Sequence, residues 1–76
     1  MNNTRRKRIE KIREELDTLS GLIEETLDEE QEGFDNLPEG LQGSERGEKM
    51  EEAVQSLQDA HDNVNDAVSS LEDATQ

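Results

Sequence analysis

The second half of the chain repeats every seven residues, and this repeat limits the possible folds more than any other feature. Large apolar residues recur at one position, and alanines recur three residues later. The two series are Met50, Leu57, Val64, Leu71 and Ala53, Ala60, Ala67, Ala74. Such a repeat is typical of helices that pack along a narrow seam. Small alanines let a neighbouring helix approach closely. We therefore predict a helix over residues 45–75, with Ser44 as its N-cap.

Apolar residues in the first half are spaced alternately by three and four positions. The series is Ile9, Ile12, Leu16, Leu19 and Ile23. This spacing predicts a second helix over residues 5–32, in which the series forms the seam. Thr4 is the expected N-cap, and Gly33 is the expected C-cap position. Gly21 lies inside the pattern and costs about 1 kcal/mol relative to alanine.

Residues 33–44 separate the two helical patterns and contain Pro38 and several glycines. Proline disfavours helix at the preceding residue, so we predict a turn in which the glycines permit chain reversal. The fold class is all-α, a single antiparallel two-helix hairpin over residues 1–76. Three apolar residues are expected to fold over its open end: Phe34, Leu37 and Leu41. Pairing of residues whose numbers add up to about 77 would set His61 level with Leu16.

The apolar content is low for a chain that must fold alone. Sixteen residues are apolar and larger than alanine, apart from Met1. A small domain with so few side chains to bury is expected to be marginally stable as a monomer. We therefore expect a homodimer that forms a four-helix bundle, or a higher homo-oligomer. The predicted interface residues are Leu22, Leu27, Val54 and Val68.

Charge is distributed unevenly along the chain, whose net charge is −13. Residues 1–13 hold six basic residues and one acid, whereas residues 24–52 hold twelve acids and two bases. Cations at the start of a helix oppose its dipole. In an antiparallel hairpin, Arg5–Arg8 would lie beside Glu72 and Asp73, which would relieve this conflict.

The acidic stretch has two interpretations. It could be a solvated surface that keeps the protein dispersed, or a surface that binds a basic partner. The predicted partner-binding residues are Asp28, Glu29, Glu30, Glu32, Glu48 and Glu52.

The run "RRKR" offers a different site, since it could bind a nucleotide or another phosphate through Arg5, Arg6 and Arg8. No aromatic residue interleaves the run, so we do not expect direct binding to nucleic acid.

Metal, cofactor and catalytic sites are not expected. The chain has no cysteine and one histidine, which disfavours a transition-metal site. Five residues match positions of a calcium-binding loop, but Pro38 and the glycines after it do not suit the exiting helix, and an acid-rich turn is the preferred interpretation. The five are Asp28, Glu30, Glu32, Gly33 and Glu39. No nucleophile is placed beside a base, so we do not expect an enzyme.

The whole chain resembles a group of small acidic helical proteins of Gram-positive bacteriophages and prophages. The resemblance is carried by a basic first helix, "RRKRIEKIREEL", by the segment "FDNLPEGLQGSERGEKMEEAV" and by the alanine-rich heptads. It implies a setting in the cytoplasm of an infected bacterium, but no common activity. The lack of a membrane-length apolar run or signal-peptide core also favours the cytoplasm and no membrane partner.

Three functions remain open at this point. The first is a non-enzymatic interaction protein that binds a host protein through its acidic surface, as an inhibitor of a defence or DNA-handling protein or as an adaptor. The second is an oligomeric sponge that binds a nucleotide or signalling phosphate through the basic residues. The third is a structural or assembly protein.

Overall fold

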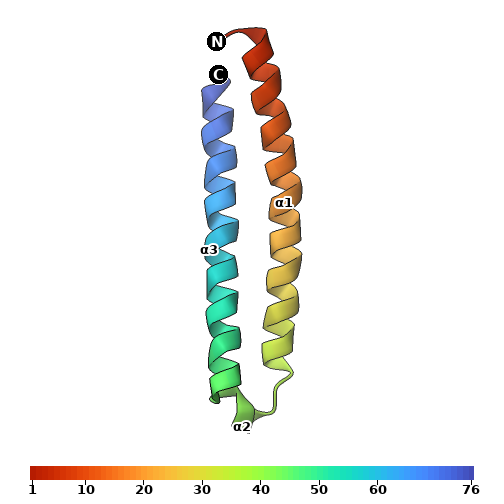
Figure 1. Ribbon diagram of the computed structural model, residues 1–76, viewed down its shortest axis with the longest axis vertical. Helices are drawn as coiled ribbons and strands as arrows, with labels where there is room; N and C mark the ends of the chain where they lie inside the picture. Colours follow the sequence, from red (N-terminus) through yellow and green to blue (C-terminus); the bar gives the residue numbers. More distant parts are fainter.

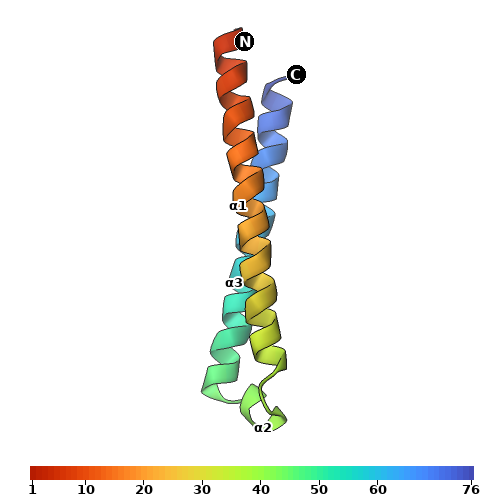
Figure 2. The same ribbon diagram turned by 90° about the vertical axis from the view of Figure 1, so that its right-hand side faces the viewer.

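The computed structural model describes all 76 residues and contains three helices. They are α1 (Asn3–Asp35), α2 (Glu39–Gln42) and α3 (Glu45–Ala74). The two long helices run antiparallel side by side, with α2 in the connection and both termini at the opposite end (Figures 1 and 2). The molecule measures 58 × 14 × 13 Å. The predicted all-α helical hairpin is therefore confirmed.

The ends of α1 differ from the prediction. Asn2, one of the preferred N-cap residues, caps the helix: its side-chain oxygen accepts a hydrogen bond from the backbone N–H of Arg5 at 2.9 Å. Thr4 therefore lies within the helix. At the other end, α1 continues through Gly33 to Asp35, because Gly33 keeps a negative φ and does not end the helix in the left-handed conformation.

The start of α3 agrees with the prediction. Ser44 is the N-cap, and its hydroxyl oxygen accepts a hydrogen bond from the backbone N–H of Gly47 at 3.4 Å. Glu45 and Glu48 lie in the first turn, where the helix dipole favours negative charge.

The connection between the long helices depends on one glycine more than on the others. No glycine has a positive φ, so none of them uses the left-handed conformation in the reversal. Gly47 is buried, and a Cβ atom there would lie 2.0 Å from the carbonyl oxygen of Gln42. A Cβ at Gly40 or Gly43 would meet nothing. The turn therefore needs Gly47 for the close approach of α3 to α2.

Side chains from the connection complete the end of α1. The Nε2 of Gln42 donates to the carbonyl oxygens of Phe34 and Leu37, at 3.4 and 3.2 Å, and so ties α2 to the end of α1. Phe34 and Leu37 are half-buried, as expected for residues that cover the open end. Leu41 is 48% exposed and does not cover it.

The two long helices pair in a different register from the predicted one. Ser20 bonds to Asn65, Glu24 faces His61 and Arg13 faces Glu72, so paired residue numbers add up to 85 instead of 77. The shift arises because α1 runs three residues beyond its predicted end and α2 takes up four residues before α3 begins. His61 is therefore not level with Leu16.

In this register, residues 1–8 have no counterpart in the second half of the chain, which ends at Gln76. The predicted proximity of Arg5–Arg8 to Glu72 and Asp73 gives no ion pair, and Arg13 pairs with Glu72 instead, at 4.0 Å. We call residues 5–8 the basic overhang.

Little of the hairpin is shielded from solvent. Val68 is the only buried apolar side chain, at 8% exposure. The radius of gyration is 17.2 Å, whereas a compact chain of this length would have about 11 Å. The contact between α1 and α3 is thus one thin seam without a closed core.

Candidate interaction surfaces

The side of α1 that meets α3 agrees with the predicted one only in part, through Ile9, Leu16 and Ile23. Partly or fully buried residues of α1 recur at spacings of three and four, but they include polar ones. They are Arg6, Ile9, Arg13, Leu16, Ser20, Ile23, Leu27, Glu30, Gln31, Gly33 and Phe34. Ile12 and Leu19, predicted in the seam, are 41% and 50% exposed. The apolar stripe of α1 is therefore rotated away from α3, and one edge of it is uncovered.

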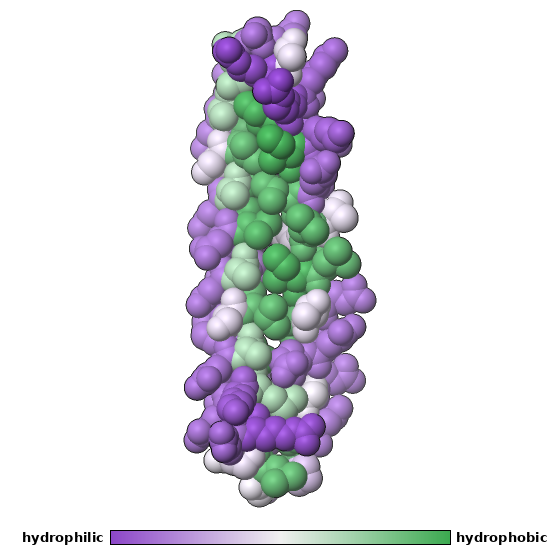
Figure 3. Space-filling view, in the orientation of Figure 1, coloured by the Kyte–Doolittle hydropathy of each residue, from purple (hydrophilic) through white to green (hydrophobic).

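This uncovered edge forms an apolar surface with part of α3. A groove of about 310 Å³ runs between the helices and is lined mainly by apolar side chains. We call these apolar residues, together with Ile12, the front face: Ile12, Leu16, Leu19, Leu22, Ile23, Leu57 and Val64. Figure 3 shows it within a green band over the upper and middle part of the hairpin, with purple hydrophilic residues on both sides.

The repeated alanines lie beside the front face. Residues on a helix turn by about 100° each, so Ala53, Ala60 and Ala67 flank the Leu57 and Val64 row on the side away from His61 and Val68. All three alanines are partly exposed. Their small side chains keep one flank of α3 low, so that another helix could approach it.

The opposite side of the hairpin, the back face, carries polar bridges between the helices. Ser20 Oγ donates to Asn65 Oδ1 at 2.9 Å, and Asn65 Nδ2 lies 3.5 Å from His61 Nδ1. His61 Nε2 lies 3.8 Å from Glu24 Oε2. About two turns closer to the termini than Ser20, Arg13 Nη1 lies 4.0 Å from Glu72 Oε1. Because Ser20 is buried, loss of its partner would leave a polar group unsatisfied, which makes this register specific.

The predicted interface residues do not share one surface. Leu22 is 53% exposed and lies on the front face. Val54 lines a hollow with Gln31, Phe34 and Glu51, away from the front-face groove. Leu27 is half-buried in the seam. The expectation that one hairpin leaves Val68 uncovered is wrong, because α1 covers it.

Acidic residues surround the turn end of the hairpin. The pair of Glu24 and His61 divides the hairpin across its length. We call residues 24–61, on the side of the turn, the turn half, and residues 1–23 and 62–76 the terminal half. The turn half holds thirteen acids and two bases, and the terminal half eight acids and six bases. Of the predicted partner-binding residues, Glu30 is half-buried and the other five are exposed: Asp28, Glu29, Glu32, Glu48 and Glu52.

These acids occupy more than one side of the turn half. Glu48 and Glu52 line an open hollow with Glu51 and Gln55. Glu30 lies at a different hollow, with both bases of this half, Arg46 and Lys49.

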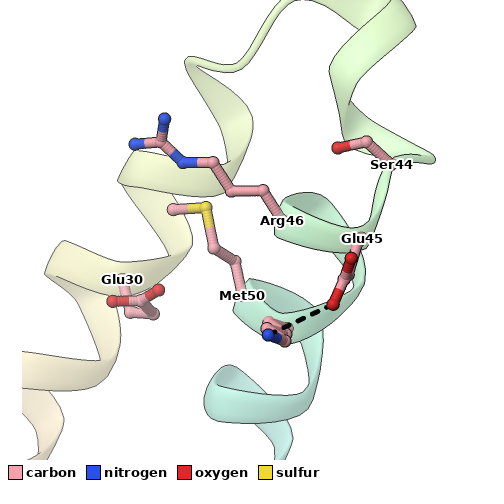
Figure 4. Close-up of a pocket in the computed structure, with 6 residues that line it drawn as sticks. Glu30, Ser44, Glu45, Arg46 and Met50 are labelled. Atoms are coloured by element: carbon pink, nitrogen blue, oxygen red, sulfur yellow. Dashed lines mark ion pairs between the residues drawn. The ribbon is translucent and has the colours of Figure 1, made fainter.

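Figure 4 shows the second of these hollows. Arg46 and Met50 reach from the first turns of α3 toward α1, where Glu30 lies, and Lys49 pairs with Glu45 at 3.3 Å. The bases are thus gathered on one side, and neither of them lines the hollow of Glu48, Glu51 and Glu52.

The calcium-like segment has no loop geometry. Asp28, Glu30, Glu32 and Gly33 lie within α1, and Glu39 begins α2. Carboxylates two residues apart on a helix point to different sides, unlike the converging ligands of a calcium loop. The structure contains no group of three or more histidine, aspartate or glutamate side chains that could hold a metal ion.

The basic overhang has no ion partner within the hairpin. Arg5, Arg6 and Arg8 form no salt bridge, and the first turn of α1 contains no acid. The Nε atom of Arg6 is buried without a hydrogen-bond partner. These cations therefore remain available for a ligand or for another chain.

Comparisons with known proteins identify no relative. No family model matches the chain, and neither a curated protein nor a solved structure matches it. Neither long helix has an apolar stretch long enough to cross a membrane.

Sequence reasoning overlooked two residues that define the hairpin. Ser20 lies seven residues after Arg13 and seven before Leu27, so the three form one row along α1. Because this row mixes polar and apolar residues, only the observed pairing of the helices shows that it faces α3. Gly47 falls seven residues before Val54 and fourteen before His61, and this place in the repeat was a usable signal that the glycine faces other parts of the fold.

Proposed function

We propose that this protein is a non-enzymatic interaction protein of phage type, which pairs into a four-helix bundle and binds a basic surface of a host bacterial protein. By this binding it acts as an inhibitor or adaptor in the conflict between phage and host. The acidic turn half supplies the contact with the host protein, and the apolar front face supplies the contact between copies.

The observation that carries the proposal is the separation of two exposed surfaces on one small hairpin. The front face is apolar and lies over the middle of the rod, whereas the turn half holds thirteen acids against two bases. A large exposed apolar patch on a small protein is typical of an interaction site. Concentrated negative charge favours fast and selective association with a positive surface.

Capture from a bacterial host lysate tests the acidic surface. The variant Glu29→Lys, Glu30→Lys, Glu48→Lys and Glu52→Lys should lose the proteins retained by the natural chain. A matched control reverses four exposed acids of the terminal half: Glu14, Asp17, Asp66 and Asp73. It changes the net charge equally and should retain those proteins. Circular dichroism checks that both variants are helical. Retention of the same proteins by both variants would overturn the acidic-surface proposal.

A second candidate function rests on the unpaired cations of the overhang. If several copies gather these residues around a nucleotide or signalling phosphate, cyclic nucleotides should raise the melting temperature. The rise should vanish when Arg5, Arg6 and Arg8 are changed to alanine, whereas the neighbouring Lys11→Ala should retain it. No shift with any nucleotide would remove this candidate.

A further inference from the structure

The hairpin as a whole exposes more surface than a compact chain of its mass, by about the area that one partner would cover. The hairpin exposes 5583 Å² to solvent, whereas a compact monomer of 8.6 kDa exposes about 4,700 Å². The excess of about 900 Å² is close to the roughly 800 Å² that each partner buries in a standard protein interface. One partner of similar length could therefore bring this chain to an ordinary degree of burial.

The front side of α1 changes character along its length. Arg5 precedes Ile12 by seven residues and Leu19 by fourteen, so these residues share one side of the helix. Beside them, Arg8 precedes Leu22 by fourteen residues, with the exposed Glu15 between them. Seven residues after Leu22, the same side reaches Glu29, and seven after Ile23 it reaches Glu30. Along one side, α1 thus runs from basic to apolar to acidic.

Two such surfaces have complementary charges only when the two copies of the chain run in opposite directions. Two copies in the same direction would bring their turn halves together, each with thirteen acids against two bases. Two copies in opposite directions would place each turn half beside a terminal half, which holds six of the eight bases of the chain. Like charges brought together across an interface are strongly unfavourable, so charge selects the second arrangement.

We propose that the front face is covered by a second copy of this chain lying antiparallel to the first, with the Arg5 and Arg8 end of each copy along the acidic turn half of the other. This inference rests on the proposed function, since it specifies the pairing into a four-helix bundle. The contact is isologous, as expected for a two-fold dimer. The alanine flank of α3 leaves room for the partner's helices.

Distances between spin labels test the direction of the two copies. The chain has no natural cysteine, so single cysteines at Asn3 or Glu39 place one nitroxide at either end of the hairpin. In the antiparallel dimer, pulsed electron resonance should give a long Asn3–Asn3 distance, approaching the 58 Å length of the hairpin. A mixture of the two labelled variants should add a short Asn3–Glu39 distance. A label at Asn63, near mid-length, should give a short distance in either direction and serves as the control.

Each outcome has a defined meaning. A dimer with short Asn3–Asn3 distances overturns the antiparallel inference and leaves the proposed dimer intact. A monomer in analytical ultracentrifugation at micromolar concentration overturns both, because the front face must then be covered by something else. A higher oligomer without the antiparallel distances also overturns the inference.

Charge reversal on the overhang tests the contact with the turn half. Arg5→Glu with Arg8→Glu should raise the dimer dissociation constant about tenfold at low salt, and less at high salt. Arg6→Glu with Lys7→Glu reverses the same charge on other sides of α1 and should have a smaller effect. Adding Glu29→Arg and Glu30→Arg to the first variant should restore much of the affinity. Equal effects of the two double variants would overturn the proposed contact.

Discussion

The front and back faces of the hairpin contain the same two helices but hold them together in different ways. On the back face, polar bridges join α1 to α3: Ser20 bonds to Asn65, and Arg13 lies opposite Glu72. On the front face, the apolar side chains of Leu19 and Leu22 are about half exposed and form no polar bridge between the helices. Hydrogen bonds are directional and apolar contacts are not, so the back face specifies register within one chain. The front face can accept another chain.

This difference explains how a stripe that is too wide for a two-helix seam becomes useful. A helix that contacts one neighbour needs a narrow apolar row, whereas a helix inside a bundle needs a broader one. The stripe of α1 has the broader form, yet only its Ile9–Leu16–Ile23 row reaches α3. The remaining row of Ile12, Leu19 and Leu22 is the part that the proposed dimer buries.

The largest effect is expected when polar residues replace leucines of the front face. Leu19→Ser with Leu22→Ser should raise the dimer dissociation constant about a thousandfold, because four half-exposed leucines per dimer lose their burial. Sedimentation equilibrium measures the constant. Leu41→Ser is the matched control, since Leu41 is 48% exposed but lies in α2, and it should leave the constant nearly unchanged. A similar shift for both variants would show that the front face has no special role.

A smaller effect is expected at Gly47, which lies in the same heptad row as Val54, His61 and Val68. Gly47→Ala would push a Cβ atom into the main chain of α2, which cannot move aside as a flexible side chain could. We expect a loss of about 2–3 kcal/mol in the free energy of unfolding, measured by urea denaturation at fixed protein concentration. Gly43→Ala, where a Cβ meets open space, should be neutral or slightly stabilising. Equal stability of the two variants would contradict the close approach of α3 to α2.

The smallest effect concerns the polar bridge at the centre of the back face. Ser20→Ala should lower stability by about 1 kcal/mol, because the hydrogen bond from Ser20 to Asn65 is lost. Ser69→Ala on the exposed side of α3 provides the reference for the higher helix propensity of alanine. If Ser20→Ala were as stable as Ser69→Ala, the bridge would not specify register. Thermal unfolding at fixed protein concentration measures the stability of both variants.

The elements of the fold were predictable because their signals are local. The repeat from Met50 to Leu71 and the cap at Ser44 depend only on neighbouring residues, and both long helices were correctly identified. The side of α1 that faces α3 was not predictable in the same way. Ile9–Leu16–Ile23 and Ile12–Leu19 are equally apolar rows, and nothing in their spacing tells which row closes the hairpin and which stays exposed.

The register was missed for a related reason. A four-residue helix such as α2 is stable only where the rest of the fold supports it, here through the contact with Gly47, so its sequence alone gives no signal. The acidic surface was predictable as charge, but its division into sides was not. That division depends on Arg46 and Lys49, which the fold gathers near Glu30.

The position of the turn also bears on how quickly the chain can find its structure. Gln42, Ser44 and Gly47 bring the ends of α1 and α3 together through contacts only three to eight residues apart in sequence. Pairs of residues farther from the turn can then form one after another, and each has only a short loop to close because the preceding pair is already in contact. Hairpins rich in such short-range contacts are expected to fold within microseconds to milliseconds. The slow step in forming the bundle would then be the encounter of two hairpins, whose rate rises with protein concentration.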